Sequence, residues 1–216
     1  MEIFFSISRA FAHEPFMWAI FIVSLFGIAL SFERLSYLKG ASSMNKDDFL
    51  TKINHYILHG NLERAIAVCT QDPNPITKIV QAGLVAVVNR KDAEEVQTAM
   101  DAVALREIPR IEKRTSLLAL MSNLATLLGL LGTISGLIGA FAAVAGVSPQ
   151  EKATMLSNSI SMAMNCTAFG LLVAIPLLGM FGYLQSRSSE LVDDIQEVAV
   201  ATLNFILSNR DKFRKG

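Results

Sequence analysis

Three long apolar stretches divide an otherwise polar chain. The first runs without a charged residue from Pro15 to Phe32, and two longer ones run from Thr115 to Gln150 and from Ala153 to Ser186. A helix rises about 1.5 Å per residue, so about 20 apolar residues cross a hydrocarbon core of roughly 30 Å. The pattern therefore predicts three membrane-spanning helices, of which the second and third project beyond the lipid.

The first stretch has one rival interpretation, a secretory signal peptide, because Arg9 precedes it. Its apolar run is longer than the usual core of a signal peptide, and it leads into Glu33-Arg34 without a small-x-small cleavage site. We therefore expect a membrane anchor.

The polar segments are predicted to be helical. Apolar residues recur every three or four positions from Phe49 to Ile57 and from Ile76 to Val87, with breaks at Gly60-Asn61 and at 72–75. A helix that starts after Asp92 is expected to run on into the second span, with a kink at Pro109. The tail has its own amphipathic stripe, formed by Leu191, Ile195, Val198, Thr202 and Phe205.

The predicted fold class is an all-α integral membrane protein with three transmembrane helices and long helices extending into the cytoplasm. Its predicted segments are an extracytoplasmic N-terminus (1–14), a first transmembrane helix (15–38), a cytoplasmic helical region (39–114), a second transmembrane helix (115–147), an extracytoplasmic hairpin (148–154), a third transmembrane helix (155–186) and a cytoplasmic C-terminal helix (187–216).

Charge placement sets the predicted orientation. One Lys or Arg precedes the first span, twelve lie between Arg34 and Arg114, one lies in the hairpin and five follow from Arg187 onward. Membrane proteins keep excess Lys and Arg on the cytoplasmic side. We therefore expect the N-terminus outside and the C-terminus inside a bacterial cytoplasmic membrane.

Composition argues against several functions. The 19 basic and 19 acidic residues cancel, so no global field favours nucleic acid. Cys69 and Cys166 are predicted to be free thiols, and the His55/His59 pair lacks the further ligands of a metal site. The sequence holds no phosphate loop, nucleophile elbow or paired carboxylate site, so we expect neither an enzyme nor a cofactor.

Small and weakly polar residues mark the second and third spans. Gly129, Gly132, Gly136 and Gly139 lie along one helix face, a spacing typical of close helix packing. Thr133 follows Thr126 by seven residues, and Thr167 lies near the middle of the third span. Such a hydroxyl either bonds to its own preceding turn or faces a polar path.

Asn165 belongs to a polar stripe with Ser157, Asn158 and Ser161 on the outer half of the third span. Asn165 and Thr167 point about 200° apart on a helix, so one is expected to face a lumen and the other a neighbouring helix. Neither long span contains an Asp, Glu, Lys, Arg or His. If the protein conducts ions by proton transfer, the titrating group must belong to a partner.

Two segments resemble the MotA/TolQ/ExbB proton channel family, most closely its ExbB/TolQ branch. Leu128–Phe141 (LGLLGTISGLIGAF) is similar to the family pattern of the second span and places Thr133 on the family threonine. Ile160–Pro176 (ISMAMNCTAFGLLVAIP) is similar to the third-span pattern and places Thr167 on a family position. Gly170 and Pro176, within the same motif, join the glycines as predicted packing positions.

The resemblance implies a homo-oligomer, in the family a pentamer, around single-span ExbD/TolR-like partners whose membrane aspartate carries H⁺ or Na⁺. It also implies an ion pathway along Thr133 and Thr167, to which we add Asn165. The chain departs from the family at Met162, where a glutamate is frequent, and at Thr126, where a proline is common.

Three functions remain open from the residues. The first is a stator-type subunit of an ion-driven membrane motor that serves an envelope process. The second is a structural membrane oligomer without ion flux. The third is a small transporter, although matching broken half-helices are lacking.

Overall fold

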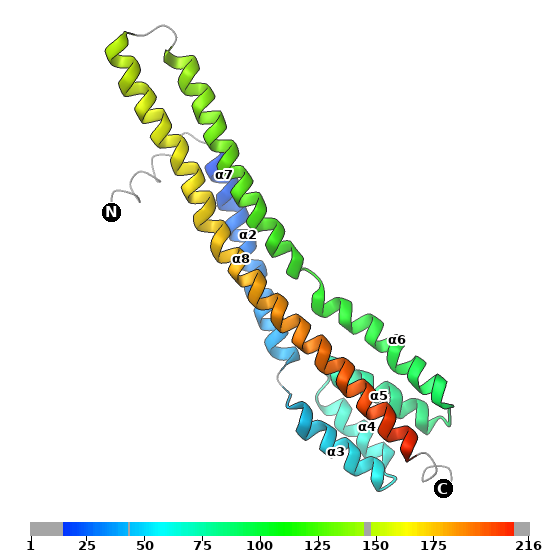
Figure 1. The fold of residues 1–216 in the computed structure, drawn as a ribbon. Helices are drawn as coiled ribbons and strands as arrows, with labels where there is room; N and C mark the ends of the chain where they lie inside the picture. The colour runs from blue at the N-terminus through cyan, green and yellow to red at the C-terminus, as the bar shows by residue number, and fades with distance from the viewer. Residues whose placement is uncertain (1–14, 43, 145–147, 210–216) are drawn as a thin grey trace. The chain divides into compact units, whose positions relative to one another are not determined.

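The computed structural model describes residues 15–42, 44–144 and 148–209, which form seven helices (Figure 1). No strand occurs among these residues, which confirms the predicted all-α class. The predicted segment 1–14, the end of the predicted second transmembrane helix at 145–147 and the end of the tail at 210–216 lie outside the described residues. The helices are α2 (Pro15–Ala41), α3 (Lys46–Leu58), α4 (Leu62–Gln71), α5 (Pro75–Val88), α6 (Ala93–Glu112), α7 (Thr115–Ala143) and α8 (Pro149–Ser208).

The chain forms two compact units. The apolar unit comprises 1–34 and 114–183, and the polar unit comprises 35–113 and 184–216. Three helical stretches of the described residues are long and apolar enough to cross a membrane, Pro15–Leu58, Ala93–Ala143 and Glu151–Ser208. Each includes one predicted span, so three long apolar helices are confirmed.

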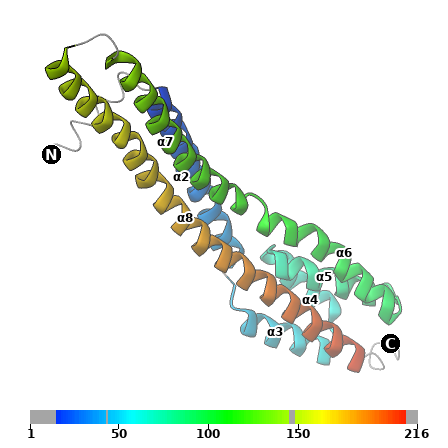
Figure 2. The same cartoon turned by 45° about the horizontal axis from the view of Figure 1, so that its top comes forward.

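In the apolar unit, α7 and α8 run antiparallel and side by side, with α2 along them (Figures 1 and 2). Gly27 gives α2 its close approach to α8, because a Cβ at this position would lie 2.7 Å from Leu177 Cδ1. Met17 of α2 and Cys166 of α8 are fully buried together. Large apolar side chains on the outer faces, such as Ile138 and Ile175, are more than 60% exposed, which suits a lipid environment.

The predicted continuous helix from Asp92 into the second span is wrong. α6 ends at Glu112, and α7 begins at Thr115. The break falls at Lys113 and at Arg114, whose φ of 70° places it in the left-handed region. Pro109 lies inside α6, and its carbonyl still accepts a hydrogen bond from the Lys113 amide at 2.9 Å. The helix therefore ends three residues after the proline that was expected to kink it, and a left-handed arginine follows five residues after that proline.

The third span and the tail form one helix of 60 residues, α8. The tail is helical as predicted, and no break separates it from the span at 186–187. Within the polar unit its predicted stripe is buried at Leu191, Ile195, Val198 and Thr202, whereas Phe205 is half-buried.

The polar unit gathers α3 to α6 and the end of α8. The predicted periodicity is confirmed, because Phe49, Ile53 and Ile57 of α3 are buried. In α5 the buried apolar positions include Ile76, Ile79, Val80 and Leu84, whereas Val87 is half-buried. Capping boxes start α5 at Asn74 and α6 at Asp92. The predicted breaks also hold, since α3 ends before Gly60, whose φ is 70°.

An ion pair fixes the start of α3 to α8. The ammonium of Lys46 lies 2.7 Å from Asp194 Oδ1 and 2.7 Å from Glu197 Oε2. These carboxylates hold the pKa of Lys46 well above its usual range. The lysine therefore stays charged at every physiological pH.

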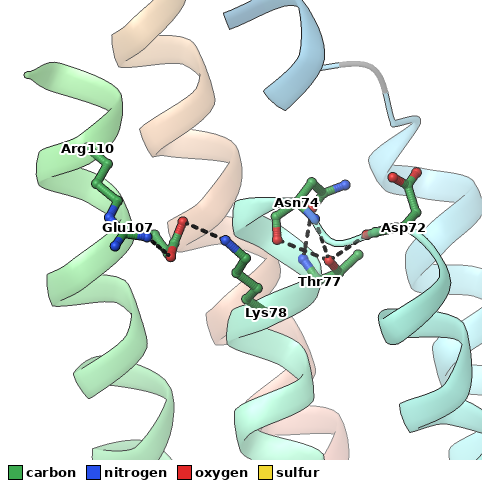
Figure 3. A network of polar contacts seen from close by, with 6 residues as sticks. All are labelled: Asp72, Asn74, Thr77, Lys78, Glu107 and Arg110. Atoms are coloured by element: carbon green, nitrogen blue, oxygen red, sulfur yellow. Dashed lines mark hydrogen bonds and ion pairs between the residues drawn. The ribbon is translucent and has the colours of Figure 1, made fainter. Parts of the chain in front are cut away.

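A buried carboxylate connects α5 to α6 (Figure 3). Glu107 is 6% exposed and accepts hydrogen bonds from Lys78 at 3.2 Å and from Arg110 at 3.1 Å. Beside it, Asn74 and Thr77 form the reciprocal bonds of the α5 capping box, and the Thr77 hydroxyl also donates to the Asp72 carbonyl at 2.8 Å. The bonds of Glu107 connect α5 to the last turns of α6, and the capping box fixes the loop before α5.

Removal of this carboxylate is expected to destabilise the polar unit. In Glu107→Ala, Lys78 and Arg110 lose their shared acceptor, but both reach solvent, so we expect a loss of about 1–2 kcal/mol. The thermal unfolding midpoint of the purified chain measures the effect. Glu63→Ala, an exposed carboxylate on α4, is the matched control. A midpoint as high in Glu107→Ala as in the control would show that the network contributes no stability.

Both cysteines are free thiols, as predicted, and both are buried. Burial raises the pKa of the Cys69 thiol to about 12. Near neutral pH this group is therefore protonated and a poor nucleophile.

Candidate functional site

The site lies along the contact between α7 and α8. Three α7 glycines touch α8 so closely that a side chain would not fit. A Cβ on Gly129 would lie 3.0 Å from the Cys166 carbonyl oxygen, one on Gly132 would lie 2.8 Å from Cys166 Cβ, and one on Gly136 would lie 2.9 Å from Ala163 Cβ. The glycines thus let two backbones of the same chain approach each other.

Gly170 completes this contact from the α8 side. A Cβ there would lie 2.7 Å from the Ala125 carbonyl oxygen and 3.1 Å from Gly129 Cα. The other two predicted packing positions differ. Gly139 has no atom within 4 Å of an added Cβ, and Pro176 is exposed within α8.

The two predicted pathway threonines use their hydroxyls differently. Thr167 donates across the contact to the Gly129 carbonyl at 3.0 Å, whereas Thr133 donates to Leu130 of its own preceding turn at 2.6 Å. The two acceptor carbonyls belong to consecutive residues, Gly129 and Leu130, so they differ in height by roughly 1.5 Å along α7. Both side chains are half-buried.

Thr126 also bonds to its own helix, at the Ser122 carbonyl 3.2 Å away. Asn165 is half-buried, two residues before the threonine that contacts α7. Thr167 faces a neighbouring helix, because its hydroxyl bonds to α7. Met162, at the position where the resemblance leads one to expect a glutamate, packs against the buried pair Met17 and Cys166.

Ser122 is a residue of this contact that sequence reasoning missed. It is 3% exposed, and its hydroxyl donates to the Ala174 carbonyl at 2.8 Å. Ser122 and Ala125 extend the glycine face backwards at the same three- and four-residue spacing, and that spacing could have revealed them. The hydrogen bond of Ser122 reaches α8 at Ala174, two residues before Pro176.

Cys166 marks the point where the three helices of the apolar unit meet. Its Cβ is the neighbour of Gly132 on α7, and it is buried with Met17 of α2. Phe16 Cβ of α2 lies 3.5 Å from the position of a Cβ on Gly132. Thr167, the next residue of α8, is therefore held by packing from two helices.

Charge is confined to the ends of this unit. Neither apolar stretch of α7 and α8 contains an Asp, Glu, Lys, Arg or His. At the boundary with the polar unit, Arg114 forms an ion pair with Glu33. Among the described residues no three His, Cys, Asp or Glu side chains come together as a metal site.

Three long apolar helices, two of them packed through glycines and cross-helix hydroxyl bonds, define a multi-pass membrane protein. The chain belongs to the MotA/TolQ/ExbB proton channel family, whose pattern it matches over residues 71–197. This match includes all of α7 and the apolar part of α8, so the site described above lies within the family domain.

Two similar proteins extend this assignment. A protein of Methanothermobacter thermautotrophicus described as a biopolymer transport protein ExbB homolog is 26% identical over 185 residues, which cover 86% of this chain and 64% of that protein. A chain from the structure of C. jejuni MotAB has the same fold, with a TM-score of 0.62 at 16% identity, over 87% of this chain and 73% of that one. The chain thus spans about two thirds of the length of the ExbB homolog.

Proposed function

We propose that this protein is the ring-forming subunit of an ion-driven membrane motor, a homo-oligomer, in the family's manner a pentamer, around a single-span ExbD/TolR-like partner. The observation that carries the proposal is that the apolar stretches 115–150 and 153–186 present hydroxyls but no Asp, Glu, Lys, Arg or His, in a chain of a proton channel family. Ion flow past the subunit transmits ion-motive force to an envelope process.

The partner supplies the carrier group. Proton relays within a membrane usually use Asp, Glu or His side chains, and the apolar stretches of this chain contain none of these. Met162 supports the assignment of the carrier group to the partner, because it packs among apolar side chains at a position where the resemblance leads one to expect an acid. A membrane aspartate of the partner provides the missing carboxylate.

Thr133, Thr167 and Asn165 form the ion pathway on this subunit. A threonine hydroxyl that donates to a backbone carbonyl keeps lone pairs that can accept from water, so both threonines remain able to solvate an ion path. H⁺ is the ion we favour, with Na⁺ as the alternative, because hydroxyl and amide oxygens serve either one.

The orientation follows from charge. We expect a reporter fused after Gly216 to be active in the cytoplasm and one fused before Met1 to be active outside, because twelve of the 19 Lys and Arg residues lie between Arg34 and Arg114 and five follow from Arg187 onward. Each fusion site carries, in turn, a reporter that is active only in the cytoplasm and a reporter that is active only outside, and both activities are measured. Activities on the opposite sides would refute the proposed topology in the cytoplasmic membrane.

Co-purification tests the assembly. The tagged chain is co-expressed with a single-span ExbD/TolR-like protein, and the mass of the intact complex is measured. We expect a ring of several copies that retains the untagged partner. A ring without any partner would favour a structural membrane oligomer.

A further inference from the structure

The end of α3, within the polar unit, carries two histidines that the fold leaves exposed. His55 and His59 are four residues apart, so they are neighbours on one helix face. Their ring centroids are 4.3 Å apart, with an angle of 44° between the ring planes. Both imidazoles are therefore close together and open to a ligand from solution.

A hydrogen bond fixes the tautomer of His59. Its Nδ1 lies 2.8 Å from the backbone carbonyl oxygen of His55, and a carbonyl oxygen only accepts, so Nδ1 carries the hydrogen. In the neutral ring the lone pair then belongs to Nε2. Histidines that bind metal ions almost always donate from their other ring nitrogen in this way, to a backbone carbonyl, a carboxylate or water, and that bond orients the ring. His59 is therefore held in the form that a metal ligand needs.

The separation of the two rings suits two bonds to one ion. An imidazole nitrogen binds Zn²⁺ at about 2.0–2.1 Å, so two imidazoles on one ion have their ring centroids roughly 4.5–5 Å apart. The observed 4.3 Å is a small side-chain rotation away from this separation. Two histidines at the same four-residue spacing on a helix also form the ligand pair of the H-E-x-x-H zinc sites.

The position of the pair on its helix favours a cation. His55 lies in the last turn of α3 and His59 is the C-cap residue, at the end where the helix dipole is negative. Lys52 precedes His55 by three residues, but its long side chain is exposed and can turn into solvent. The softer ligands of the chain, Cys69 and Cys166, are both buried and do not compete for an ion in solution.

We propose that His55 and His59 together bind one divalent transition-metal ion of the group Zn²⁺, Ni²⁺ and Cu²⁺, for which imidazole is a suitable ligand. Among the described residues no third His, Cys, Asp or Glu joins the pair, so water completes the coordination. The site is therefore open, unlike a structural zinc site with four protein ligands. The bound ion links the last turn of α3 to its C-cap and stabilises this end of the helix. The inference goes beyond the proposed motor function and does not depend on it.

Metal titration of the purified full-length chain, freed of any affinity tag, tests the site. Zn²⁺ is added to the metal-free chain in a calorimeter, and we expect one bound ion per chain. The second imidazole binds intramolecularly, so His55→Ala and His59→Ala are each expected to weaken binding about a hundredfold. His13→Ala is the matched control, because His13 is the remaining histidine of the sequence, and it should bind Zn²⁺ like the wild type.

Two further measurements identify the ligands and the effect of the ion. One equivalent of Cu²⁺ at neutral pH should give an electron paramagnetic resonance spectrum with coupling to two nitrogens in the wild type and to one in each single variant. Zn²⁺ should raise the thermal unfolding midpoint of the wild type and of His13→Ala, because an ion that binds only the folded chain stabilises it. The midpoints of His55→Ala and His59→Ala should not respond to the same Zn²⁺ concentration.

Three results would overturn the inference. Unchanged Zn²⁺ affinity in both His55→Ala and His59→Ala would place the bound ion elsewhere on the chain. No Zn²⁺ binding by the wild type, or coupling of its Cu²⁺ to a single nitrogen, would show that His59 only caps α3 through its bond to the His55 carbonyl. None of these results concerns the ring or its partner, so the proposed function stands or fails separately.

Discussion

Replacement of Gly170 by leucine is expected to abolish the folded apolar unit. Even a Cβ at this position would lie 2.7 Å from the Ala125 carbonyl oxygen, and both atoms belong to packed helix backbones that cannot move aside alone. Overpacking a close contact costs about 1–3 kcal/mol, and a clash with backbone on both sides exceeds that range. With mRNA at the wild-type level, we expect the variant to give little or no monodisperse protein in size-exclusion chromatography.

Gly139→Leu is the matched control, because a Cβ on Gly139 meets nothing within 4 Å in the chain. It adds the same apolar side chain to α7, the other helix of this contact, and should give normal yields. Gly170→Ala should be intermediate. Equal yields of Gly170→Leu and Gly139→Leu would show that α7 and α8 do not pack as described.

The second large effect concerns the hydroxyls of Thr133 and Thr167. We expect the double variant Thr133→Val/Thr167→Val to insert, assemble and bind its partner, yet to lose ion flux. Membrane hydrogen bonds of this kind contribute about 0.6 kcal/mol on average, so loss of the bonds to Leu130 and Gly129 leaves the fold largely intact. A valine offers no lone pair to water or an ion, and the path becomes apolar.

Single variants should lose less flux than the double variant, since one hydroxyl per subunit remains. Thr126→Val is the matched control, because its hydroxyl also bonds to its own preceding turn and lies outside the proposed pathway. Flux is compared at equal amounts of assembled complex. Wild-type flux in the double variant would assign both threonines to helix packing alone.

The sequence was sufficient for the features that depend on local hydropathy. Long uncharged runs predicted the three spans, and the periodicity around Ile53 and Ile195 predicted which faces are buried. These signals are local because a residue's preference for lipid, core or water does not depend on its distant neighbours.

The break between α6 and α7 could not be predicted in the same way. Left-handed backbone favours glycine, yet here it falls on Arg114, whose side chain pairs with Glu33 81 positions away. No residue near 113–114 signals this partner. The sequence instead offered Pro109, which α6 accommodates inside its last turn.

The register between α7 and α8 could not be predicted from the sequence either. The glycine spacing predicted a close contact, but it did not say whether the neighbouring helix belongs to the same chain. The structure places Cys166 and Gly170 of the same chain there. Ser122 and Thr167 donate to the backbone carbonyls of Ala174 and Gly129, and which carbonyl each one meets depends on that register. Every residue has a backbone carbonyl, so residue type does not reveal these acceptors.

Ion flux into liposomes tests the central claim most directly. Three preparations are compared: the chain with its proposed single-span partner, the chain alone, and the chain with a partner whose membrane aspartate is replaced by asparagine. Uptake of H⁺ or Na⁺ into the liposomes is measured under a gradient of each ion. We predict flux of one ion from the wild-type pair only, because the carboxylate comes from the partner. Equal flux from the chain alone, or no flux of either ion from the assembled wild-type pair, would contradict this account.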